Sequence, residues 1–209
     1  MVMPPENDAA LIFMPGSSGH GSFWNPVRQL FDGYRSTALD WPGLGGNRPV
    51  EGVDSFDDLV EWAIGRITEP SALIGQSMGG FVAMRVAVQR PDLVTHLVLS
   101  VTSAGVDRGR LGISDWRPTA DEGDAAWVAD PQRTLDEKLP SVDIPTLLLW
   151  ATDDEISPLA IAHRLEDLLP QSTLATFQSS SHWFILDHVP QIAGHIRTLL
   201  QPAGLAAGS

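Results

Sequence analysis

Residues 71–80 read SALIGQSMGG, and this short stretch decides how the rest of the chain is interpreted. An apolar run of strand length leads straight into a Gly-x-Ser-x-Gly turn, and a helix-like apolar segment follows. Such a turn forces the serine into a sparsely populated backbone conformation and lifts its hydroxyl off the sheet, because Gly75 and Gly79 carry no side chains that would collide. The stretch therefore predicts that Ser77 is a nucleophile.

Apolar runs of strand length alternate with helical patterns along the rest of the chain. The expected strands are Ala9–Met14, Arg35–Asp40, Ala72–Gln76, His96–Val101, Thr146–Ala151 and Leu174–Phe177. The expected helices are Phe23–Phe31, Asp54–Ile67, Met78–Gln89, Leu159–Leu168 and Pro190–Leu200, with helix starts at Asp54-Ser55 and Ser157-Pro158. Unbroken apolar strands suit burial on both faces of a parallel sheet. The alternation predicts a single α/β domain over residues 1–209, doubly wound, with functional residues at the carboxyl ends of the strands.

Residues 102–142 interrupt this alternation. The segment has no clear strand, is rich in Gly, Asp and Arg, and contains Trp116 and Trp127. A stretch of this length between two strands is commonly functional. We therefore expect a small lid inserted into the domain.

Composition limits the classes of partner. The formal net charge of −13, from 13 basic and 26 acidic residues, disfavours nucleic acid and anionic membranes. The chain has no cysteine, which excludes disulfides, thiolate zinc sites and cysteine nucleophiles. The first residues show no secretory signal, and no apolar run could span a bilayer. We expect a soluble, cytoplasmic protein.

A serine nucleophile needs a base that takes its proton, and histidine is the usual one. His182 follows the polar run at residues 179–181, in a loop after the last expected strand from which an imidazole could reach Ser77. His188 is the alternative. The other histidines lie in strand or helix patterns or, for His20, in a Gly-rich loop. We predict that His182 is the base.

The base needs an acid that fixes its tautomer and stabilises the imidazolium. Residues 150–158 read WATDDEISP and follow an expected strand, so three carboxylates stand at its end: Asp153, Asp154 and Glu155. All three cannot be buried, and we favour Asp154 over Asp153. The chain order Ser77, Asp154, His182 is the one found in serine hydrolases built on an α/β sheet.

The tetrahedral intermediate of acyl transfer needs backbone N–H donors. Met78, directly after the nucleophile, is the first candidate. The second is expected from the glycine-containing loop at residues 14–21, where we favour the N–H of Ser17, although an ordinary Gly-rich turn is the alternative. Neither Gly-x-Gly-x-x-Gly nor a Walker lysine occurs, so we expect no nucleotide site.

Seven tryptophans suggest an aromatic-lined apolar pocket. Four of them lie near the candidate loops or in the expected lid and are candidate pocket residues: Trp24, Trp116, Trp127 and Trp183. For Trp41 and Trp62, filling of the core is at least as good an interpretation.

Together these residues resemble the α/β-hydrolase superfamily over nearly the whole chain. The family's nucleophile turn is similar to residues 75–80, its Asp-x-Pro-Gly-x-Gly loop to residues 40–45, and its Gly-His near the C-terminus to residues 181–182. Its acid segment, Trp-Gly-x-x-Asp-x-x-x-Pro, aligns with residues 150–158 and places the acid at Asp154. The turn and the closing helix look most like the small esterase and lactonase branch with a reduced cap.

The chain departs from the family pattern without losing a triad member. The usual His-Gly before the oxyanion donor is Pro15-Gly16, and the usual Gly before the base is Ser181. Only about eight residues precede Ala9, which leaves almost no room for the family's first two strands. The resemblance therefore implies a mostly parallel sheet of about six strands flanked by helices.

The resemblance implies a carboxylic ester hydrolase that acts on a small, apolar acyl substrate through an acyl-enzyme on Ser77, with no cofactor and no metal. The same triad serves thioesterases, lactonases, cofactor-free perhydrolases, and C–C hydrolases or lyases. Epoxide hydrolases and haloalkane dehalogenases of this fold need an aspartate nucleophile, so Ser77 argues against them. A non-catalytic ligand-binding protein on the same scaffold is the alternative from another class.

Overall fold

A parallel sheet of six strands forms the centre of the computed structural model, which describes residues 10–114, 127 and 134–201. The strands are β1 (Ala10–Met14), β2 (Ser36–Ala38), β3 (Ser71–Gln76), β4 (Val94–Ser100), β5 (Thr146–Ala151) and β6 (Ser172–Phe177). Every neighbouring pair is parallel. The prediction of an α/β fold with about six parallel strands is confirmed.

The strand order, β2-β1-β3-β4-β5-β6, shows where the chain changes direction across the sheet. Strand β2 lies on one side of β1 and β3 on the other. The later strands β4, β5 and β6 then follow in order beyond β3. In open parallel sheets, ligands bind at the carboxyl ends of the strands that flank such a reversal. The topology therefore points to the residues that follow β1 and β3.

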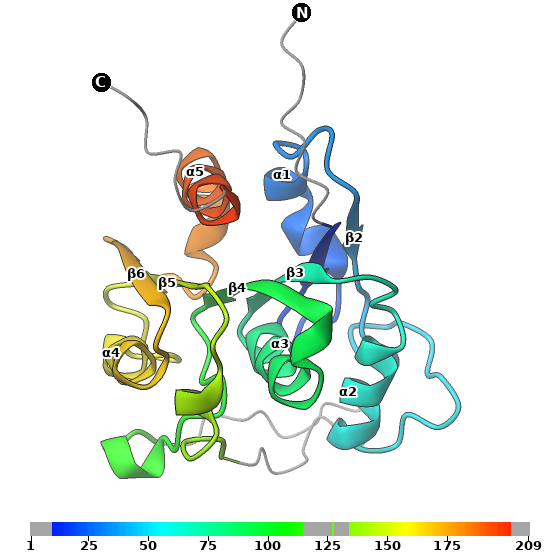
Figure 1. Ribbon diagram of the computed structural model, residues 1–209, viewed down its shortest axis with the longest axis horizontal. Helices are drawn as coiled ribbons and strands as arrows, with labels where there is room; N and C mark the ends of the chain where they lie inside the picture. The colour runs from blue at the N-terminus through cyan, green and yellow to red at the C-terminus, as the bar shows by residue number, and fades with distance from the viewer. Residues whose placement is uncertain (1–9, 115–126, 128–133, 202–209) are drawn as a thin grey trace, which may run out of the picture.

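Helices cover both faces of this sheet, as the doubly wound prediction requires (Figure 1). The helices α1 (Asn25–Arg28) and α5 (Val189–Leu200) lie on one face and contact each other. The helices α2 (Phe56–Ile64), α3 (Met78–Gln89) and α4 (Leu159–Leu168) lie on the opposite face. Short 3₁₀ helices span Gly21–Trp24, Pro91–Leu93, Gly109–Leu111, Leu139–Ser141 and Phe184–Leu186.

Burial follows position in the sheet. Every residue of β1, β3 and β5 is buried, which matches the unbroken apolar runs in their sequences. The edge strands β2 and β6 keep part of their surface exposed, because each has a neighbour on one side only. The centre of the sheet is therefore its most completely buried part.

Two element boundaries show what local side chains decide. Helix α2 begins after Ser55, whose hydroxyl oxygen accepts a hydrogen bond from the backbone N–H of Asp58, as expected for a helix start. The single helix expected over Phe23–Phe31 is wrong. The chain forms a 3₁₀ helix, then α1, and then i→i−3 turns in which Leu30 donates to Val27.

Only part of the segment expected to form a lid lies within the described residues. Residues 102–114 and 134–142 leave β4 and return to β5, and the N–H of Leu135 donates to the carbonyl of Gly105. Trp116 lies outside the described residues. The lid over residues 102–142 stays a prediction. Among the described helices, none combines the length and the hydropathy needed to cross a membrane.

Candidate active site

Ser77 occupies the sharp turn between β3 and α3, with φ 53° and ψ −119°. Non-glycine residues rarely adopt positive φ, so the surrounding structure must hold this conformation in place. The N–H of Ser77 donates to the carbonyl of Ser100 at 2.9 Å, and its own carbonyl accepts from the N–H of Gly80 at 3.0 Å. The tight, strained turn predicted from the Gly-x-Ser-x-Gly motif is confirmed.

The glycines of this turn are required by direct backbone contact. A Cβ atom at Gly75 would lie 2.5 Å from the carbonyl oxygen of Gly79. A Cβ atom at Gly79 would lie 2.3 Å from the carbonyl oxygen of Met14, at the end of β1. The loop after β1 therefore packs directly against the first turn of α3, beside Ser77.

His182 and Asp154 form a buried pair at the same edge of the sheet. His182 lies in the loop after β6, Asp154 lies in the loop after β5, and the imidazole Nδ1 is 2.6 Å from the carboxylate Oδ2. Both residues are buried. Since parallel strands place their carboxyl ends together, β3, β5 and β6 bring Ser77, Asp154 and His182 to one edge.

The surroundings of Asp154 keep its carboxylate ionised. Burial acts to raise its pKa, but the hydrogen bond from His182 and the charge of that imidazole lower it, and the backbone N–H groups of Ser157 and Ile156 lower it further. Those N–H groups donate to Oδ1 at 3.1 Å and 2.8 Å. The net result is a pKa below the ordinary value for an aspartate.

The neighbouring carboxylates have different surroundings. Asp153 is exposed, and its carboxylate accepts hydrogen bonds from the side chains of Thr152 and Gln178. Glu155 is also exposed. Of the three carboxylates at the end of β5, Asp154 alone is buried against an imidazole.

Ser157 holds the Asp154 loop with three polar groups, a role that was not predicted. Besides its N–H on Asp154, its hydroxyl donates to the carbonyl of Val101 at 2.8 Å, and its carbonyl accepts from the indole N–H of Trp150 at 2.7 Å. The helix start expected at Ser157-Pro158 is confirmed, because Pro158 is the N-cap residue of α4. Val101 has φ 39°, which is strained for a β-branched residue.

The loop after β1, where an oxyanion donor is expected, is held by two indoles. Trp24 donates to the carbonyl of Met14 at 3.0 Å, and Trp41 donates to the carbonyl of Pro15 at 2.9 Å. The carboxylate of Asp40 accepts from the N–H of Gly21 at 2.7 Å. The Asp-x-Pro-Gly-x-Gly motif that begins at Asp40 therefore supports the first loop.

Ser17 and Met78, the expected oxyanion donors, lie in the two segments that meet here. Met78 is the first residue of α3, where helix N–H groups have no partner within the helix. Ser17 lies in the turn after β1, next to Gly16, where a Cβ atom would lie 3.3 Å from Cβ of Ser77. The donation of both N–H groups to one substrate oxygen stays a prediction.

The four tryptophans expected to line a pocket differ in position. Trp24 is fully buried in the core and packs against Phe13, and its role as a pocket wall stays a prediction. Trp127 is also buried, with its ring 6.3 Å from that of Phe56. Trp183 is 55% exposed, and its ring stands edge-on to His182 at 6.0 Å. Trp116 lies outside the described residues.

A hollow of about 370 Å³ opens beside His182, next to the loop after β5 that carries Asp154. It is lined by Asp153, Asp154, Glu155, Ile156, Ser180, Ser181, His182 and Trp183. Among the described residues, no group of three or more histidines and carboxylates is arranged to hold a metal ion.

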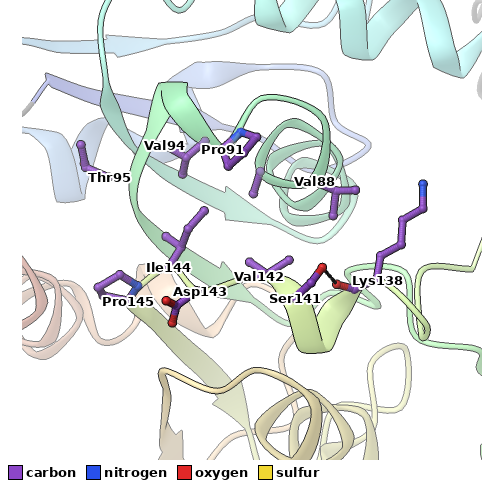
Figure 2. A pocket seen from close by; sticks show the side chains of 11 residues that line it. Val88, Pro91, Val94, Thr95, Lys138, Ser141, Val142, Asp143, Ile144 and Pro145 are labelled. Atoms are coloured by element: carbon purple, nitrogen blue, oxygen red, sulfur yellow. Dashed lines mark hydrogen bonds between the residues drawn. The ribbon is translucent and has the colours of Figure 1, made fainter.

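A larger hollow of about 530 Å³ lies at the opposite end of the strands, where β4 and β5 begin (Figure 2). Its walls combine apolar side chains, such as Val94 and Ile144, with polar ones, such as Thr95, Lys138 and Asp143. The hydroxyl of Ser141 donates to the carbonyl of Lys138 within the wall. This hollow shares no residue with the site around Ser77.

Comparison with known proteins agrees with this geometry. A model of the alpha/beta hydrolase family matches residues 11–195. A pimeloyl-[acyl-carrier protein] methyl ester esterase of Aliivibrio salmonicida is 22% identical, over 92% of each chain. A 2-hydroxy-6-oxononadienedioate/2-hydroxy-6-oxononatrienedioate hydrolase of Pseudomonas is 24% identical, over 83% of this chain and 80% of the other. The solved structure of naproxen esterase from Bacillus subtilis superposes with a TM-score of 0.75 at 18% identity, covering 94% of this chain and 85% of that one.

Proposed function

Because the chain belongs to the α/β hydrolase family, we propose that it is a serine hydrolase that cleaves carboxylic esters through an acyl-enzyme on Ser77. One observation carries the proposal. The buried pair of His182 and Asp154, joined at 2.6 Å, stands at the same edge of the sheet as the strained turn of Ser77. Ester hydrolysis is supported by relatives that are named esterases.

In the proposed reaction, His182 takes the proton of the Ser77 hydroxyl as its oxygen attacks the ester carbonyl carbon. The N–H groups of Met78 and Ser17 donate to the oxyanion. His182 then gives the proton to the departing alcohol, which leaves the acyl group on Ser77. A water molecule, deprotonated by His182, attacks the acyl carbon and releases the acid.

Asp154 would act through His182 and not on the substrate. Its lowered pKa keeps the carboxylate charged throughout the neutral range, so it can stabilise the imidazolium each time His182 holds a proton. The N–H groups of Ser157 and Ile156 fix the direction of that carboxylate. This arrangement supports base catalysis in both halves of the reaction.

The proposed substrate is a small ester with an apolar acyl group. A net charge of −13 opposes the approach of a polyanion, and the exposed carboxylates of Asp153 and Glu155 stand beside the site. A cytoplasmic location stays a prediction from the sequence.

Hydrolysis of a bond other than an ester is the second candidate. The Pseudomonas relative is named for an oxo-dienedioate that contains no ester group. Thioester, lactone and perhydrolase chemistry would use the same three residues. A panel of p-nitrophenyl esters, lactones and acyl thioesters of graded chain length separates these candidates by kcat/KM.

A fluorophosphonate probe tests the nucleophile. We expect the probe to label wild-type protein at Ser77 and to abolish esterase activity in proportion to labelling. Ser77→Ala should take no label and lose essentially all turnover, while Ser141→Ala, at the opposite end of the strands, should behave as wild type. Well-folded protein that takes no label would instead support the non-catalytic ligand-binding alternative.

A further inference from the structure

Gln76, the residue before Ser77, touches two loops that are distant in the sequence. It is the last residue of β3 and is 3% exposed. Its side-chain Nε2 donates to the backbone carbonyl of His182 at 3.2 Å. Its Oε1 lies against Gly16, so closely that a Cβ atom at Gly16 would be 2.3 Å from it.

Sheet geometry explains why the His182 loop needs such a contact. The loop follows β6, which is three strands away from β3 in the sheet. With neighbouring strands about 4.8 Å apart, β6 lies roughly 14 Å from β3. The loop must therefore reach back over β5 and β4 to approach Ser77, and the Gln76 amide binds it at its far end.

The burial of an amide here has no packing rationale of its own. An apolar side chain of the same length would fill the space without the cost of removing an amide from water. A buried amide is retained at low cost only when its hydrogen bonds are made. Here the bond that is made fixes the main chain of the residue that carries the imidazole.

We propose that Gln76 is a positioning residue, whose amide sets the His182 loop and the Gly16 loop around Ser77. This inference rests on the proposed function, because it gives Gln76 a role in the chemistry of that same site. The imidazole acts as base and acid in the reaction and not in substrate binding. Misplacement of His182 should therefore lower kcat and leave KM almost unchanged.

Two substitutions test the amide donor. Gln76→Met keeps the length of the side chain and removes both polar atoms, and Gln76→Glu keeps the shape and the oxygen beside Gly16 but replaces the donor with an acceptor. At pH 8 we expect both to lower kcat about tenfold to a hundredfold, with KM within about twofold of wild type. Gln171→Met, which removes an exposed amide at the start of β6, is the matched control and should keep wild-type kinetics.

Thermal unfolding separates positioning from a general loss of structure. The expected result is a large drop in kcat in a variant whose Tm lies within a few degrees of wild type. A Gln76→Glu protein with wild-type kcat would overturn the inference, since it has lost the donor. A variant in which KM rises by the same factor as kcat falls would overturn it as well.

A double-mutant cycle keeps the inference testable if Gln76→Met fails to fold. In Gly16→Ala, the new methyl group must displace the Gln76 amide, because it would fall 2.3 Å from Oε1. Gln76→Ala removes this collision and leaves only the contact of that methyl with Cβ of Ser77, at 3.3 Å. If Gln76 acts as proposed, Gly16→Ala should cost much less kcat in the Gln76→Ala background than in wild type. Additive losses would contradict the inference.

Failure of the inference and failure of the proposed function give different results. If wild-type protein takes no fluorophosphonate label and hydrolyses no ester, the proposed function fails. If wild type is active and Ser77→Ala is inactive, yet the Gln76 variants keep wild-type kcat, only the inference on Gln76 fails.

Discussion

Asp153 and Asp154 are adjacent in the chain, yet the structure separates them by burial and by partner. Asp154 is buried against His182, whereas Asp153 faces solvent. We expect Asp154→Asn to lower kcat/KM by roughly a thousandfold to ten-thousandfold, because an amide cannot hold the required imidazole tautomer. Asp153→Asn should stay within about twofold of wild type. Initial rates with p-nitrophenyl acetate measure both, and the reverse order would show that the acid is misassigned.

His96 provides a residue-scale test of pH dependence. It lies half-buried in β4, and burial lowers its pKa below the ordinary imidazole value. The unfolded chain therefore binds the proton more readily, so stability is complete above about pH 6.5 and falls as the pH drops below it. We expect wild-type Tm to fall more steeply than that of His96→Gln between pH 7.5 and 5. Parallel Tm curves for the two proteins would contradict this.

The residues that the sequence could and could not identify differ in kind. Ser77, Asp154 and His182 belong to local patterns at strand ends, so the sequence could single them out. Gln76 and Ser157 each donate a side-chain hydrogen bond to the main-chain carbonyl of a residue that is distant in the sequence. Gln76 reaches a residue 106 positions away, and no local pattern encodes such a contact.

At the scale of the element, a hydrogen bond links the loop that carries Asp154 to the end of β4. The hydroxyl of Ser157 provides that link through the carbonyl of Val101. Ser157→Ala leaves a buried carbonyl unpaired, so we expect a loss of about 1–3 kcal/mol in the free energy of unfolding and a lower kcat. Urea denaturation measures the first effect. Ser141→Ala, in an exposed 3₁₀ helix, should change stability little, and an equal loss there would exclude a specific role for Ser157.

Helix α5 contains a position where a substitution should increase the free energy of unfolding. Gly194 lies inside this helix, and a Cβ atom there would meet nothing within 4 Å. Gly194→Ala should raise the free energy of unfolding by about 0.5–1 kcal/mol, because alanine restricts the unfolded chain. Gly79→Ala is the contrast, since its methyl would collide with backbone atoms of Met14 and Pro15, and we expect marked destabilisation. A destabilised Gly194→Ala protein would contradict this reading of α5.

Elements were predictable where burial was complete. Strand β5 has the bounds that its apolar run predicts, and the match at β3 is within one residue. The bounds of the edge strand β2 were not predictable in this way. It was expected over Arg35–Asp40 but spans Ser36–Ala38. An edge strand is defined by how far its single neighbour extends, which the hydrophobic pattern does not contain.

At the scale of the whole molecule, the chain carries 26 acidic and 13 basic residues. Such an excess of one charge destabilises the compact state through self-repulsion, and salt screens it. The Debye length falls from about 30 Å at 0.01 M salt to about 8 Å at 0.15 M. We expect Tm to rise over this range of NaCl concentration. A falling Tm would mean that attractive pairs such as Arg85–Asp57 outweigh the repulsion.

The order of the strands along the chain determines which part of the sequence carries each residue of the proposed triad. The turn of Ser77 follows β3, whereas Asp154 and His182 follow β5 and β6. A chain interrupted anywhere between β4 and β5 therefore leaves the serine on one fragment and its proposed partners on the other. Neither fragment alone holds all three groups, so turnover by a mixture of the two would report their reassembly.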